Sequence, residues 1–319
     1  MIRLMPIILL WFVAPLELLA DATQLSGGVD GRYLSQQPLW GAVAGEDGLN
    51  LRGSFLNIRQ VISDDKGDRY ILVAQLDAND NLDELEAYQV YGQLKGSLGG
   101  VNLRLGRYIL PFGLLSYLDT ERQLIQTNES VALGIKLDTG VQLFGFVDDV
   151  NYALSVSQGV NKSRGTLDDP DSNKLWLARL GLQQEESRWG LSYLHGQVAT
   201  DNTDFFRQSN SHKQRLAMDA ELDFFPWLLR LQLDTGKDDG RSVSGAVLLA
   251  DYDLAAKWSL NSKLSVWKDT DELNEVSLGL TYSLPQNFIF RLAQSWQQLN
   301  NIDDSIFSLQ LYWDFSHAL

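Results

Sequence analysis

The chain has 319 residues, of which 45% are hydrophobic, and its formal net charge is −15 at pH 7. It contains no cysteine, which excludes a disulfide-stapled secreted domain, a thiolate metal site and a cysteine nucleophile. The acidic surplus argues against a nucleic-acid partner, because nucleic-acid binding requires clustered lysine and arginine.

Residues 1–22 have the pattern of a secretory signal peptide. Arg3 supplies a basic start, residues 4–14 are mostly apolar, and the stretch ends in Ala-Asp-Ala, which fits the small-x-small rule for cleavage. The apolar run is too short for a membrane-spanning helix, which needs about 20 residues. We therefore expect cleavage after this stretch and a single domain at 23–319. A membrane anchor or a buried helix is the alternative.

The rest of the chain is dominated by side chains that alternate between apolar and polar, as expected of strands. Residues 215–224 and 305–315 show the pattern most clearly. In the first of them, Asp219, Glu221 and Asp223 share one face. Three acids on one face would disrupt a soluble core, whereas a water-filled lumen accommodates them. A soluble β-sandwich is the alternative to a barrel.

The connections between the expected strands are of two kinds, which alternate along the chain. The short ones are 63–68, 96–100, 148–149, 185–188, 225–226, 254–257 and 285–287. The longer or more acidic ones are 36–48, 78–83, 109–136, 161–173, 200–212, 237–241, 269–273 and 299–304. Outer-membrane barrels have short periplasmic turns and longer outward loops. The sequence therefore predicts an all-β, transmembrane, antiparallel up-and-down β-barrel of about sixteen strands with both termini periplasmic.

Aromatic residues fall near the ends of many expected strands, mostly on the apolar face. They are Trp189, Tyr193, Trp227, Tyr252, Trp258, Tyr282, Phe288, Trp313 and Phe315. Aromatic girdles of transmembrane barrels lie at the two membrane interfaces. The placement therefore favours the barrel over a sandwich.

The longest connection and its flanks resemble a known family. The strings at 105–107 (LGR), 110–114 (LPFGL), 119–122 (DTER) and 139–145 (TGVQLFG) resemble the outer-membrane porins related to the phosphate-selective (O/P-like) family. The resemblance covers roughly residues 100–160 at the level of motifs. It implies a sixteen-stranded barrel, often a homotrimer, whose third outward loop folds into the lumen and forms the constriction.

Carried onto this chain, that loop is 109–136. It would place four charged residues near the pore: Asp119, Glu121, Arg122 and Glu129. A loop that splays outward over the surface is the alternative. Pro111 and Gly113 would make the chain turn sharply out of the strand in either case.

The polar faces of the expected strands supply the candidate pore-lining residues. They are Arg52, Arg104, Arg179, Arg215, Arg230, Arg291, Asp219, Glu221 and Asp223. Arginines that face acids across a lumen would order water and select solutes by size and dipole. For any single arginine, a local ion pair in the wall is an equal alternative. Acids in the outward loops would repel phosphate, so we do not carry over a phosphate specificity.

Catalysis has little support in the sequence, and we expect no enzyme, no metal and no cofactor. The three histidines have no metal-like or nucleophile-like spacing, and the spacing of His195 and Ser192 puts them on opposite faces of a strand. The predicted function is a passive diffusion channel for small hydrophilic solutes or ions in a bacterial outer membrane. The expected partners are outer-membrane lipid and lipopolysaccharide. The alternative is a structural barrel that sheathes a partner protein such as an electron-transfer cytochrome.

Overall fold

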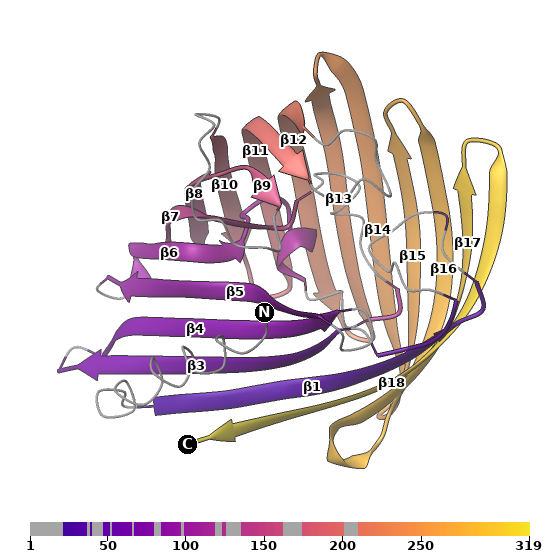
Figure 1. Cartoon of the computed structure of the whole chain (residues 1–319), viewed down its shortest axis with the longest axis horizontal. Coiled ribbons are helices and arrows are strands. Elements are labelled where there is room, and N and C mark those ends of the chain that lie inside the picture. Colours follow the sequence, from indigo (N-terminus) through magenta and orange to yellow (C-terminus); the bar gives the residue numbers. More distant parts are fainter. Residues whose placement is uncertain are drawn as a thin grey trace.

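A computed structural model describes residues 22–36, 39, 47–51, 53–65, 67–79, 84–96, 99–118, 123–125, 135–161, 174–200 and 210–319. The predicted signal peptide lies outside these residues except for Ala22, which begins the first strand. The described strands form one sheet that closes on itself, because β1 pairs with β18 from Gln24↔Ala318 to Leu34↔Ser308 (Figure 1). The chain is a closed antiparallel β-barrel, as predicted.

Within the described ranges, sixteen long strands build the wall. Their bounds are β1 (Ala22–Leu34), β3 (Ser54–Asp64), β4 (Gly67–Asn79), β5 (Glu84–Lys95), β6 (Asn102–Ile109), β7 (Leu137–Val147), β8 (Val150–Ser157), β10 (Leu175–Gln183), β11 (Ser187–Thr200), β12 (Asn210–Phe224), β13 (Trp227–Asp238), β14 (Arg241–Ala255), β15 (Trp258–Lys268), β16 (Glu272–Ser283), β17 (Phe288–Leu299) and β18 (Ile302–Ala318). The short elements are β2 (Gly48–Asn50), β9 (Val160–Asn161) and the 3-10 turns η3 (Leu115–Tyr117) and η5 (Pro285–Asn287). Among the described residues, no helix has the length and apolar character that a membrane crossing requires.

The apolar and polar side chains that alternate in the sequence lie on opposite faces of the wall. On β12, Met218 points outward and is 50% exposed, whereas Asp219 points inward and is 2% exposed. Successive side chains of a strand point to opposite faces, so each strand contributes one set to the interior and one to the outside. The predicted separation into an apolar outer face and a polar inner face is present on this strand.

Both termini of the barrel lie at the same end of the wall, where Gln24 pairs with Ala318. The hairpins Asp64↔Gly67 and Val147↔Val150 also turn at that end. At the opposite end the strands continue further than the sequence indicates. Pairing on β13 and β14 runs to Asp238↔Arg241, and the predicted loops 237–241, 269–273 and 299–304 shrink to tight turns.

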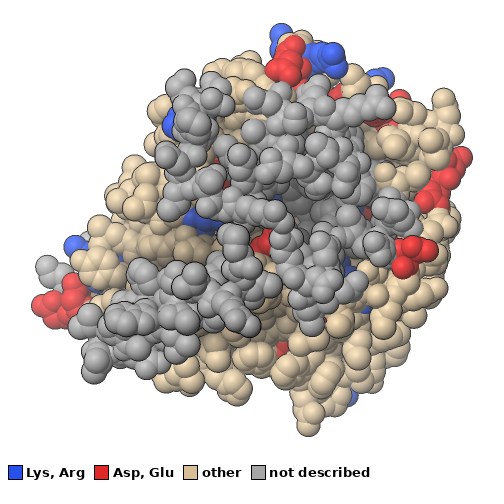
Figure 2. Space-filling view, in the orientation of Figure 1, with Lys and Arg blue, Asp and Glu red and all other residues tan. Residues whose placement is uncertain are grey.

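The outer surface carries aromatic side chains at both ends of the strands. At the end that holds the termini, the rings of Trp227 and Tyr252 are tilted against each other with centroids 4.6 Å apart, and the Trp258 ring centroid lies 4.4 Å from that of Tyr282. Toward the other end, exposed aromatic side chains that the sequence analysis did not single out form a second belt, including Tyr33, Trp176, Trp296 and Phe307. In Figure 2 the flank of the described surface is mostly uncharged, and charged side chains gather toward the margins.

The spacing of the two belts is of the order of the height of the apolar band of transmembrane barrels. On β17, the path from Phe288 to Trp296 is about 27 Å along the strand. A strand tilt of about 40° reduces this to roughly 20 Å, close to the ~25 Å apolar band of transmembrane barrels. Leucines and valines such as Leu264, Leu278 and Leu311 lie exposed between the belts.

Candidate functional site: a loop segment held against the inner wall

The connection between β6 and β7 leaves the wall at the end opposite the termini and turns into the barrel. The N–H of Leu110 donates to the carbonyl of Lys136 at 2.9 Å, which holds the two ends of this connection together. Phe112 and Leu110 are fully buried, in one apolar cluster with Tyr108 and Ile135. The wall contributes the other members of that cluster: Leu175, Leu177, Leu194, Val198 and Ala217.

These wall residues lie on the inner faces of β10, β11 and β12, where a channel wall is usually polar. Leu177 pairs with Leu194, and Leu194 pairs with Arg215, so all three side chains share the inner face. This docking site for the loop was not predicted from the sequence. The sequence did contain an indication, because residues 175–177 are apolar on both faces, whereas a strand with water on its inner side is expected to be polar there.

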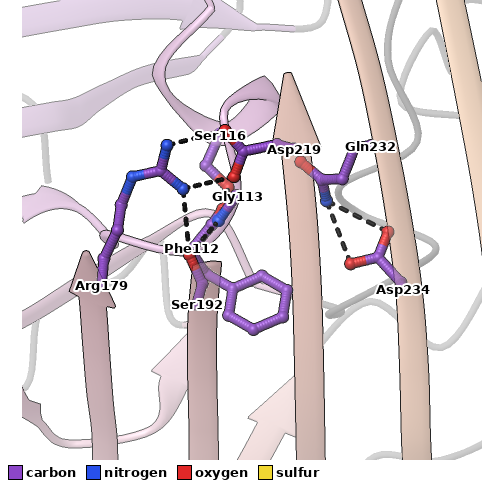
Figure 3. Close-up of polar contacts among 8 residues, drawn as sticks. All are labelled: Phe112, Gly113, Ser116, Arg179, Ser192, Asp219, Gln232 and Asp234. Atoms are coloured by element: carbon purple, nitrogen blue, oxygen red, sulfur yellow. Dashed lines mark hydrogen bonds and ion pairs between the residues drawn. The ribbon is translucent and has the colours of Figure 1, made fainter. Parts of the chain in front are cut away.

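Gly113 brings the loop backbone into contact with the wall (Figure 3). Its N–H donates to Ser192 Oγ on β11 at 3.0 Å. Its φ of +66° is one that side-chain-bearing residues rarely adopt, and a Cβ at this position would lie 2.1 Å from Oε1 of Gln232 on β13. The amide of Gln232 donates to both carboxylate oxygens of Asp234 at 3.1 Å. A glycine therefore allows the loop to approach this part of the wall.

An ion pair on the wall supports the same contact. Arg179 on β10 donates to both carboxylate oxygens of Asp219 on β12, at 2.5 and 2.8 Å, and also to Ser192 Oγ at 3.0 Å (Figure 3). Ser192 Oγ thus accepts one hydrogen bond from the wall and one from Gly113. The Tyr117 ring of η3 lies 5.9 Å from the Arg179 guanidinium carbon. The loop is therefore fixed to the wall by the Gly113 backbone, the Ser192 hydroxyl and the Arg179 guanidinium together.

Further described parts of the connection contact later strands. Leu118 packs against Val247 and Leu249 on the inner face of β14. Ile125 clusters with Ala293 on β17. The described parts therefore follow the inner wall from β10 to β17. The predicted near-pore residues Asp119, Glu121, Arg122 and Glu129 lie outside the described residues, so their position stays a prediction.

The cross-strand register places most of the candidate pore-lining residues on the inner face of the wall. These are Arg104, Arg179, Arg215, Arg230, Arg291, Asp219 and Glu221. Asp223 shares their parity but is exposed at the end of β12. Arg52 lies outside the described residues. Whether these residues line an open path for solutes stays a prediction.

Three of the inner-face arginines, Arg179, Arg215 and Arg230, form ion pairs along the wall. Arg230 bonds Glu221 at 2.8 Å and Asp251 at 2.9 Å, on the strands to either side. Arg215 lies 2.7 Å from Asp238, on the adjacent strand. From the sequence we expected arginines to face acids across the lumen. In the pairs of Arg215 and Arg230, the acid and the arginine lie on adjacent strands of the same part of the wall, because residues opposite each other on neighbouring strands are much closer than residues across a barrel.

The described histidines lie away from the inner wall site. His195 and His212 are in edge contact, with ring centroids 4.8 Å apart, and His195 is exposed on the outer face while Ser192 is buried on the inner face. Within the described ranges, no group of three His, Cys, Asp or Glu residues is arranged to hold a metal ion.

No protein-family model and no curated protein sequence matches this chain. Solved structures do match it. OmpT with a deletion of loop L8, an outer membrane protein of Vibrio cholerae, aligns with a TM-score of 0.71 at 8% identity, over 92% of this chain and 99% of that one. The anion-selective porin from Comamonas acidovorans gives a TM-score of 0.67 at 13% identity, over 93% of this chain and 99% of that one. The chain has the porin fold.

A third similar structure is Salmonella typhi OmpF in complex with daunomycin, with a TM-score of 0.68 at 11% identity, over 92% of this chain and 97% of that one. These identities are low, so the likeness concerns the fold. The predicted resemblance to porins is supported at this level. The narrower resemblance to the phosphate-selective family stays a prediction.

Proposed function

We propose that this chain is an outer-membrane channel through which small hydrophilic solutes or ions diffuse passively. The observation that carries the proposal is the loop segment held inside a closed barrel by Gly113, Ser192 and the apolar cluster around Phe112. A closed barrel with an apolar outer band suits a bilayer, and an inward segment narrows the path through it. The likeness to solved outer-membrane porins supports the same function.

In this function, selectivity arises from the width of the path and from the charges beside it. The connection 109–136 forms the constriction, and the inner-face ion pairs supply a polar wall that replaces part of a solute's hydration. We propose that residues 1–22 direct export, that both termini face the periplasm, and that the protein contacts outer-membrane lipid and lipopolysaccharide. A similar structure is described as a trimer, which supports a homotrimer here. Among the described residues, no contact favours the alternative of a sheath for a partner protein.

The experiment that tests the function is conductance in planar lipid bilayers. The chain from residue 23 onward is refolded in detergent and added to one side of the bilayer. We expect discrete conductance steps whose current is proportional to voltage. Barrels that insert, as shown by protease protection, but carry no current would contradict the proposal.

A further inference from the structure

Arg104 differs from Arg179, Arg215 and Arg230, which are inner-wall arginines that bond carboxylates. It lies on β6, and its two terminal nitrogens donate to amide oxygens on the flanking strands, to Gln142 on β7 and to Gln93 on β5, each at 3.1 Å. Its guanidinium carbon lies 4.5 Å from the Tyr91 ring centroid and 4.6 Å from that of Phe144. All four neighbours are neutral.

Arg179 and Arg230 are neutralised by carboxylates, whereas Arg104 has none beside it in the described part of the chain. Each of those arginines donates to at least one carboxylate within 3 Å. Among the described residues, no carboxylate lies within ion-pair distance of Arg104. Its positive charge is therefore oriented by its neighbours but not neutralised by them.

The neighbours account for only part of the hydrogen-bonding capacity of Arg104. A guanidinium has five N–H donors, one on Nε and two on each terminal nitrogen. Gln142 and Gln93 take one donor from each terminal nitrogen, and Nε is buried without a partner. Because Nε has no exposed surface, the donors left for an acceptor from outside the protein are the second N–H groups of the two terminal nitrogens.

The surroundings strengthen the attraction of this site for an anion. Aromatic faces and amide oxygens hold the guanidinium at a cost below that of burying a bare charge. Low-dielectric walls around a channel focus the field of such a charge into the path. The side chain is partly exposed, so solutes in the barrel interior can reach it.

We propose that Arg104 is an anion-binding position inside the channel, which takes small anions such as chloride or carboxylates. The inference rests on the proposed channel function and adds a preference to it. A purely mechanical alternative is that Arg104 clamps β5 to β7 and has no part in permeation.

The test measures zero-current potentials in a potassium chloride gradient, from which the chloride-to-potassium permeability ratio follows. Coulomb's law in water gives about a four-fold change in local ion concentration for a unit charge about 5 Å away. We expect Arg104→Gln to lower the permeability ratio about four-fold or more. Arg104→Lys keeps the charge but loses the paired hydrogen bonds, so it should retain most of the ratio.

A second variant neutralises the arginine without removing it. Gln93→Glu keeps the shape of the side chain and places a carboxylate 3.1 Å from Arg104. It should lower the ratio as Arg104→Gln does. The matched control is the double variant Lys95→Gln, Asp68→Asn, which removes the ion pair between the end of β5 and β4. It leaves the net charge of the protein unchanged, so its permeability ratio should stay at the wild-type value.

The outcomes separate the inference from the channel function. A conducting Arg104→Gln protein with the wild-type ratio overturns the anion site and leaves the channel intact. Equal losses in Arg104→Gln and Arg104→Lys, with Gln93→Glu unchanged, overturn it in favour of the mechanical clamp. A wild-type barrel that inserts without conducting overturns both.

Discussion

Replacing Gly113 by alanine should release the inward loop from the wall. Two effects add at this position. A φ of +66° costs an L-residue roughly 1–2 kcal/mol. The new Cβ would also displace the Gln232 amide from Asp234, and losing that hydrogen bond costs about 1 kcal/mol.

Together these costs come to roughly 2–3 kcal/mol, and every 1.4 kcal/mol is ten-fold in an equilibrium constant. The population of undocked loop should therefore rise about 30- to 140-fold. In single-channel recordings we expect Gly113→Ala to show a larger mean conductance and more current noise than the wild type. The fully assembled barrel should keep its resistance to unfolding in detergent, because the substitution lies outside the strands.

The chain offers a matched control in Gly240, in the turn between β13 and β14. Its φ is +84°, and nothing lies within 4 Å of the position that a Cβ would take. Gly240→Ala therefore introduces the backbone strain without a steric clash. Because none of the contacts between the described loop residues and the wall involves this turn, the variant should leave the conductance unchanged. Adding Gln232→Ser to Gly113→Ala makes room for the methyl group and should restore part of the wild-type conductance.

Identical recordings from Gly113→Ala and the wild type would refute this reasoning. Such a result would mean that the contact between Gly113 and the wall does not set the position of the loop. An equal rise in Gly240→Ala would attribute the effect to general strain in the barrel.

Two further predictions concern stability, measured as the urea midpoint of unfolding in lipid vesicles. Arg179→Met leaves Asp219 as a buried, unpaired carboxylate and should cost about 3–5 kcal/mol, whereas adding Asp219→Leu should recover much of that loss; equal midpoints for the single and double variants would contradict the pairing. Leu264→Arg on the outer face should cost about 2–4 kcal/mol in a bilayer, and Asn261→Arg on the inner face of the same strand should cost far less. Similar losses for these two variants would argue against a lipid-facing outer surface.

Much of the wall could be predicted from the sequence. The alternation at 215–224 correctly separates Asp219 from Met218, and the connection between β6 and β7 begins and ends where the sequence places it. The tight turns after β13, β15 and β17 were not predicted, because polar and acidic residues at strand ends are compatible with either a loop or continued pairing. The aromatic belt at the end holding the termini was expected, whereas the belt with Trp176 and Trp296 was not.

The docking site of the loop was harder to predict. Ser192 and Gln232 are ordinary polar residues on inner faces, and nothing near them in the sequence marks them as partners of Gly113. The leucines at 175 and 177 gave a signal, since an inward apolar side chain in a polar lumen needs something to cover it. The four predicted near-pore residues of the loop lie outside the described residues, so the constriction itself stays a proposal.

The sequence by itself determined which residues of a regular strand share a face, because the side-chain period of a strand is two wherever the strand lies. The register shifts at Ile62/Ser63, Gln75/Leu76 and Asp253/Ala255 were visible only in the structure. The sequence also indicated an exported, acidic protein without membrane-spanning helices, through the acidic composition, the absence of cysteine and the lack of an apolar helix-length run after residue 22. Only the tertiary structure decided which charges neutralise each other. Arg179 meets Asp219 across an intervening strand, while Arg104 meets only amides and aromatic rings. Those contacts depend on strand register and on the path of the loop, which bring together residues that are far apart in the chain.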